Sequence, residues 1–181
     1  FPAGVELAGS DPAQMDEETL MLIGSSSASA ARKLKFLRGA LGIPAAAAGI
    51  AGLQFLVEGY LEATASRGGS PRVTWFSGEG TKVLVDELGT AASPLVLNMC
   101  LMVIESLPVC QCIDFILERR TTFCLIVAGH GEPQRAAAWR PEVLDAVSLA
   151  PSVALSVKTI QPHLAKRLSE GAGGRLLLDA Q

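Results

Sequence analysis

Apolar residues recur at helical spacing through the first third of the chain. In segment 25–42 (SSSASAARKLKFLRGALG), Leu34, Leu37 and Leu41 share one helical face. Serine is favoured at the start of a helix and glycine at its end, so this segment predicts a helix with a serine cap and a glycine stop. Segment 17–24, just before it, predicts one or two further helical turns.

A second helical pattern covers residues 43–69. It opens with Pro44, which suits the first position of a helix, and it closes with two glycines. The stretch between Arg38 and Glu58 is uncharged, which makes it a weak candidate for a membrane span. Its alanines and glycines contribute little to membrane insertion, however, and they equally permit a close contact between helices.

The pattern changes at residue 70. PRVTWF (71–76) and TTFCLIV (121–127) are rich in β-branched and aromatic residues, and each predicts a strand. SVALSVK (152–158) and GRLLLDA (174–180) are weaker strand patterns. Helical patterns occupy the segments 134–139, 141–149 and 160–171, and segment 81–89 fits a short helix with a strand as the alternative.

Strands that alternate with helices favour an α/β or α+β fold. We expect a helical N-terminal part followed by a small, mostly parallel sheet with crossover helices. Three regions follow from this interpretation: an extended arm at 1–16, a helical segment at 17–69 and a small α/β domain at 70–181. The arm is predicted because its Gly, Pro and Asp residues show no periodicity.

Segment 91–120 raises the question of a membrane span. Its apolar run begins near Pro94 and ends in two arginines, which suit the negative end of a helix dipole. Glu105 and Asp114 lie inside it, and a charge at the bilayer centre costs about 3 kcal/mol on insertion. Pro108 would also divide it into two helices, each too short for a span of ~20 residues. A buried helical core is therefore favoured over a single span.

Composition narrows the range of partners. The chain has 181 residues, of which 49% are hydrophobic, 5% aromatic and 18% charged, with a net charge of −3. So little charge leaves much weakly polar surface, and a partner often covers such surface. Because there is no basic excess, nucleic acid is not expected as a partner. The expected partners are other protein subunits, with peripheral membrane contact as a further option.

The cysteines indicate a reducing environment. Cys100, Cys110, Cys112 and Cys124 all lie in apolar runs and form no CxxC pair, so we expect buried, reduced thiols. The chain offers only two histidines and no zinc-ligand spacing, so neither a metal nor a cofactor is predicted. Because the chain begins at Phe1, we expect a processed protein in an intracellular compartment, with a plastid or mitochondrion as one option after removal of a targeting peptide.

A glycine-containing loop follows the first predicted strand. In SGEGTK (77–82), the weak candidate ligand-binding residues are Gly78, Gly80, Thr81 and Lys82. A loop between a strand and a helix can bind phosphate through its backbone N–H groups. The spacing does not complete a Walker or a dinucleotide-binding motif, so a simple tight turn explains the residues as well.

A second candidate loop, 129–133, carries an imidazole. Glycines flank His130, and Glu132 follows, at the end of a predicted strand. Ligand sites in open α/β sheets collect at the carboxyl ends of strands, where His130 would be a candidate general base with Glu132 beside it. No recognisable nucleophile accompanies them, so both are weak catalytic candidates, and a turn before a helix is the alternative.

Basic residues cluster on the first predicted helix. Arg32, Lys33, Lys35 and Arg38 form a candidate interaction surface for an anionic membrane face or an acidic partner, and a solvated helix face is the plainer alternative.

These patterns favour a non-catalytic accessory subunit of a larger protein complex and lean against an enzyme. A membrane-associated or organellar complex is one option. The alternative is a small-molecule or phosphate-binding enzyme with a Rossmann-like core, in which the loops 77–82 and 129–133 meet at one edge of the sheet.

Overall fold

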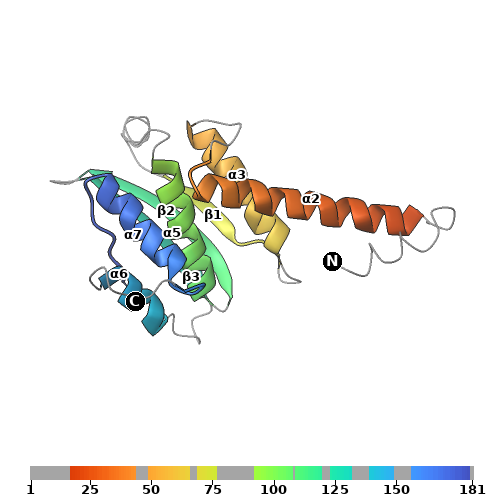
Figure 1. Ribbon diagram of the computed structural model, residues 1–181. Helices are drawn as coiled ribbons and strands as arrows, with labels where there is room; N and C mark the ends of the chain where they lie inside the picture. Colours follow the sequence, from red (N-terminus) through yellow and green to blue (C-terminus); the bar gives the residue numbers. More distant parts are fainter. Residues whose placement is uncertain are drawn as a thin grey trace.

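The computed structural model describes residues 17–43, 49–65, 69–76, 92–107, 109–119, 123–131, 139–148 and 156–179 (Figure 1). Its elements are α2 (Glu17–Ala40), α3 (Gly49–Thr64), β1 (Arg72–Trp75), α5 (Ser93–Ser106), β2 (Cys110–Arg119), β3 (Phe123–Gly131), α6 (Pro141–Ser148) and α7 (Ile160–Gly171). The expected arm at 1–16 and the expected helix at 81–89 lie outside the described residues, as does most of the segments 134–139 and 152–158.

The three described strands form one mixed sheet in the order β1-β2-β3. β1 pairs with β2 in parallel, whereas β2 and β3 are antiparallel. The mixed α/β class and the helical N-terminus agree with the sequence pattern. A mostly parallel sheet with a series of crossover helices is not seen in the described part of the chain, because β3 follows β2 directly as an antiparallel neighbour.

The second half of the apolar segment 91–120 is a strand, not the expected helix. Its side chains alternate between the two faces of the sheet: Ile113, Phe115 and Leu117 are buried, and the residues between them are half-exposed. An alternation with a period of two indicates a strand with one face on the core. Within the described residues, no helix is long and apolar enough to cross a membrane.

Helix α5 packs against the inner face of the sheet. Val96, Leu97 and Cys100 of α5 belong to the same buried cluster as Ile113 and Phe115 of the sheet. A Cβ atom on Gly129 of β3 would clash with Val103 and would lie 2.6 Å from Leu107 Cδ1. The glycine therefore lets the end of α5 approach the backbone of β3 closely.

Helices α2 and α3 form a hairpin that joins this core at one end. Phe36 of α2 is fully buried and stacks on Tyr60 of α3, with ring centroids 4.3 Å apart. α2 ends in a Schellman motif, because the N–H of Ile43 bonds to Arg38 O and Gly42 has a positive φ of 78°. The expected glycine stop is thus confirmed, but α2 runs without a break through the serines that were expected to cap it.

A buried amide ties the hairpin to α5. Asn98 is 2% exposed, and its Nδ2 donates hydrogen bonds to Ala40 O (2.7 Å) at the end of α2 and to Pro94 O (2.8 Å). The last carbonyls of a helix have no partner within the helix, so Asn98 satisfies one that would otherwise be buried without a hydrogen bond. The proposed domain boundary near residue 69 stays a prediction.

The C-terminal part covers the other side of α5. Ala165 of α7 and Leu176 are buried against Met102 of α5. Helices at 141–148 and 160–171 are confirmed, whereas the strand expected at 174–180 is not formed over the described residues 174–179. Leu176 is buried by α5 and α7 instead of by a strand neighbour, so its apolar character reflects helix packing.

The cysteines differ in burial. Cys100 is fully buried, and burial raises the pKa of its thiol to about 12, so this thiol stays protonated. Cys110, Cys112 and Cys124 are only partly buried, which corrects the expectation that all four are core residues. All four are free thiols.

We expect Gly129→Ala to destabilise the fold by about 1–3 kcal/mol, because the added methyl group overpacks the contact between α5 and the sheet. Gly171→Ala is the matched control, since a Cβ at that position meets nothing within 4 Å. Urea unfolding of both variants measures the effect. Equal stability of the two variants would contradict the close approach at Gly129.

We expect Asn98→Ala to destabilise the fold by about 1–3 kcal/mol, because the buried Ala40 carbonyl loses its donor. Ser25→Ala removes a hydrogen bond from Oγ to Leu22 O on an exposed part of α2 and should cost less. Thermal unfolding followed by circular dichroism compares the two, and a similar loss in both would show that Asn98 does not join the hairpin to α5.

Candidate functional site

The outer face of the sheet carries a cluster of polar side chains. Thr74 of β1 is in register with Asp114 of β2, and Cys112 of β2 is in register with His130 of β3. The neighbours Val73, Ile113 and Phe115 face the core. Because side chains alternate along a strand, the cluster lies on the face away from α5.

Asp114 and His130 form the centre of this cluster. His130 Nε2 lies 2.9 Å from Asp114 Oδ2. The His130 side chain is 59% exposed and that of Asp114 27%, so the carboxylate is held within the sheet surface while the imidazole reaches solvent. The two residues stand on neighbouring antiparallel strands, diagonally across the ladder, where long side chains come within reach of each other.

Two further donors hold the carboxylate. Cys112 Sγ lies 3.4 Å from Asp114 Oδ1, and the Thr74 side chain also hydrogen bonds to Asp114. Partial burial raises the pKa of Asp114, but the hydrogen bonds from Thr74, Cys112 and His130, together with the imidazole charge, outweigh it and lower the pKa overall. The carboxylate is therefore ionised at neutral pH.

An ionised Asp114 fixes the proton of the imidazole. Because a carboxylate only accepts hydrogen bonds, Nε2 of His130 carries the hydrogen and donates it to Asp114. The other ring nitrogen, Nδ1, then has a lone pair and can act as a base or as a nucleophile. This arrangement favours proton abstraction or covalent catalysis at an open surface.

The two strands that precede the candidate loops end at different places along β2. β1 ends at Trp75 beside Phe115, whereas β3 ends at Gly131 beside Cys110 at the opposite end of β2. The crevice expected for a Rossmann-like core requires parallel strands that end at the same edge, and the antiparallel β3 prevents it. Gly78, Gly80, Thr81, Lys82 and Glu132 lie outside the described residues.

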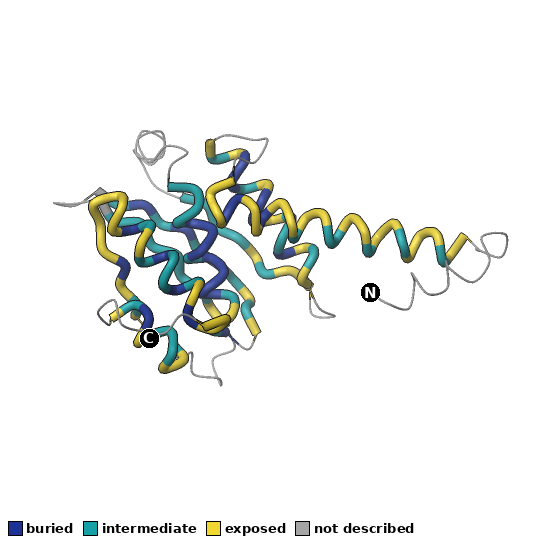
Figure 2. The backbone as a smooth tube through the Cα atoms, viewed as in Figure 1, coloured by how far each residue is buried: buried dark blue, intermediate teal, exposed yellow. Residues whose placement is uncertain are grey.

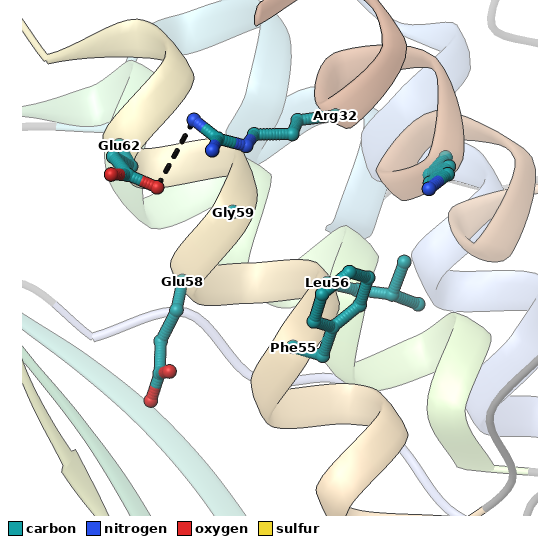
Figure 3. A pocket seen from close by; sticks show the side chains of 7 residues that line it. Arg32, Phe55, Leu56, Glu58, Gly59 and Glu62 are labelled. Carbon is teal, nitrogen blue, oxygen red and sulfur yellow. Dashed lines mark ion pairs between the residues drawn. The ribbon is translucent and has the colours of Figure 1, made fainter. Parts of the chain in front are cut away.

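The basic residues of α2 differ in their surroundings. Arg32 and Lys35 line a small pocket between α2 and α3 (Figure 3), Arg38 is exposed elsewhere on α2, and Lys33 is half-buried. Arg32 Nη1 forms an ion pair with Glu62 at 3.1 Å. Lys35 Nζ lies 5.8 Å from the centre of the Phe55 ring. Arg32 is thus engaged within the hairpin, and the interaction surface stays a prediction.

His130 was singled out from the sequence, but its partners were not. Asp114 lies sixteen residues away in a segment expected to be helical. The alternation of buried and half-exposed residues from Cys112 to Leu117 is the signal that places Asp114 on a strand face, and it was overlooked because the segment is so apolar. The strand register, which sets the contact with His130, cannot be read from one sequence.

Nearly the whole chain resembles a solved structure in fold. The chain matches no protein family and no curated protein by sequence. A solved protein described as a bacterial phosphotransferase superposes with a TM-score of 0.68 at 24% identity, over 98% of this chain and 80% of that chain. A likeness at this identity establishes a shared fold.

This likeness overturns the expectation of a non-catalytic accessory subunit. The solved protein that shares the fold over nearly the whole chain is described as a transferase enzyme, not as an accessory subunit. The sequence holds few recognisable motifs, but the absence of a motif is weak evidence against an enzyme, because residues of a site can come together only through strand register.

We expect the cluster to stabilise the fold in a pH-dependent way. The pKa of Asp114 is lowered from its ordinary value of 3.8 in the folded state. A lowered pKa means that the stabilisation is fully present above the unfolded pKa and is lost as the pH falls through the folded pKa. Urea unfolding between pH 6 and roughly pH 2.5 should therefore show a steeper acid loss in the wild type than in Asp114→Asn. Identical pH profiles would contradict the network around Asp114.

Proposed function

We propose that this protein is a phosphotransferase in which His130 accepts and passes on a phosphoryl group. The observation that carries the proposal is the exposed His130 imidazole, whose Nε2 is held 2.9 Å from a carboxylate that is ionised at neutral pH. The likeness of the fold to a bacterial phosphotransferase supports the same reaction class.

The chemistry follows from the orientation of the ring. Nδ1 of His130 attacks the phosphorus of a phosphoryl donor, and a new N–P bond forms as the bond between phosphorus and the leaving oxygen breaks. The leaving group departs with the bonding electrons. The ring becomes positively charged, and Asp114 stabilises that charge through the hydrogen bond that it accepts from Nε2. Transfer to an acceptor reverses these steps.

The setting of His130 suits exchange with a large partner. A phosphorylated histidine must be reached in turn by a donor and by an acceptor, and the 59% exposed side chain lies on an open sheet face, not in a closed pocket. Thr74 and Cys112 donate to Asp114, so neither competes with the incoming phosphoryl group for Nδ1. Among phosphoryl donors, an acyl phosphate needs the least help from the protein to release its leaving group, because the leaving carboxylate is a weak base.

The test is phosphoryl transfer to the purified chain from acetyl phosphate labelled with ³²P. We expect a label that is lost in acid and kept in alkali, which distinguishes an N–P bond from an acyl phosphate. His130→Gln should abolish the label. Asp114→Asn should reduce its rate by roughly tenfold or more, because the ring loses both its fixed tautomer and its counter-charge.

His163→Gln is the matched control, because the chain has only two histidines and His163 is on α7, away from the cluster. It should keep full labelling. Labelling that persists in His130→Gln, or that is lost only in His163→Gln, would refute the assignment of the acceptor.

A further inference from the structure

Helix α2 has a second face that the rest of the described chain does not cover. The helix has 24 residues, about 36 Å, and it projects from the body as an arm (Figure 1). Ser29 bonds to Ala63 O near the end of α3, so the part of α2 before Ser29 extends past the hairpin. Figure 2 shows exposed residues along most of its length.

The exposed face has a regular composition. Positions separated alternately by three and four residues, from the first turn of α2 to the residue after its end, are all exposed: Glu17, Leu20, Gly24, Ser27, Ala31, Leu34, Arg38 and Leu41. We call these residues the α2 seam. This spacing is that of the contact positions of a coiled coil. The side of α2 that packs on the body is a different one, with Phe36, Gly39 and Ala40 buried.

The leucines of the seam are each more than half exposed. Leu20 is 51%, Leu34 59% and Leu41 68% exposed. Small residues occupy the middle of the seam, from Gly24 to Ala31, and a Cβ on Gly24 would meet nothing within 4 Å. Large residues toward the ends and small ones between them make a surface that another helix can approach closely.

We propose that the α2 seam binds the α2 seam of a second copy of this chain, with the two helices antiparallel. In this register the seam positions of the two copies face one another in order along the helices. Leu34 of one copy lies against Gly24 of the other, and Ser27 lies against Ala31. A leucine thus meets a glycine on either side of the centre, and the centre of the contact is formed by small side chains alone.

Charge selects the antiparallel direction. Glu17 begins the seam and Arg38 lies near its other end. In the antiparallel pair, Leu20 faces Arg38 and Glu17 faces Leu41 of the second copy, so Glu17 of each copy lies one turn from Arg38 of the other. In a parallel pair Glu17 would face Glu17 and Arg38 would face Arg38, and like charges in facing positions destabilise the contact.

The same features argue against a membrane surface as the occupant. An interfacial helix has a wide apolar face and basic residues on its opposite face. The α2 seam is narrow, its central positions are small or polar, and Glu17 and Arg38 lie within it. The Leu34–Gly24 pairing and the opposite charges of Glu17 and Arg38 therefore favour a second copy of this helix over a membrane surface.

The test is the mass of the full 181-residue chain in solution, measured by light scattering and by sedimentation equilibrium over a range of concentrations. We expect a dimer. Leu34→Glu should raise the dissociation constant by about tenfold or more, since it places a charge against the second copy. Leu177→Glu is the control, because Leu177 is 69% exposed outside the helices and should leave the dimer intact.

A charge exchange tests the direction of the helices. Glu17→Lys and Arg38→Glu should each weaken the dimer, and the double variant should restore it, because opposite charges are then again one turn apart. A monomeric wild type would overturn the proposal. A dimer that is insensitive to Leu34→Glu would overturn it as well, as would a double variant weaker than both single variants. Circular dichroism of each variant confirms that α2 remains folded.

Discussion

Two glycines determine how closely α5 can approach its neighbours, and the rest of the structure depends on that approach. A Cβ on Gly39 would lie 2.9 Å from Leu97 Cδ1 of α5, and a Cβ on Gly129 would lie 2.6 Å from Leu107 Cδ1. One glycine lets the end of α2 meet α5, and the other lets the end of α5 meet the sheet. A single helix of 14 residues can therefore join hairpin, sheet and C-terminal helix in one core. The side chain of Asn98 supplies a polar contact between α5 and the end of α2 at this junction.

Helix α5 packs on one face of the sheet, and the polar cluster lies on the other face. On the covered face, Trp75 stacks on Phe115 with ring centroids 4.3 Å apart, which fixes the register of β1 against β2. On the open face that same register places Thr74 beside Asp114. Core packing thus determines the geometry of the polar cluster, although none of the cluster's own side chains is in the core. A strand holds a side chain in a more exact position than a loop does, and His130 stands on a strand.

The sequence predicted the elements whose signals are local and failed where tertiary contacts decide. β1, β3, α6 and α7 follow from β-branched runs, prolines and glycines, and the glycine stop of α2 follows from Gly42. β2 was mistaken for a helix because Ile113, Phe115 and Leu117 continue the apolar run of α5, and only their alternation separates the two. Leu176 was predicted to lie in a strand, but it is buried by packing against α7. His130 was recognisable as a candidate, whereas its contact with Asp114 depends on pairing between strands, which no single segment encodes.

The arm and the polar cluster have separate places in the molecule, and this separation has a functional consequence. The body is attached at the end of α2 where Asn98 binds Ala40, so an antiparallel pair of α2 helices would hold the two bodies at opposite ends of the contact. His130 of one copy would then be too far from His130 of the other for direct exchange of a phosphoryl group. Exchange would require a separate donor and acceptor, each with access to the open sheet face. The proposed dimer and the proposed transfer are compatible, because the α2 seam is on the hairpin and His130 is on the face of the sheet opposite α5.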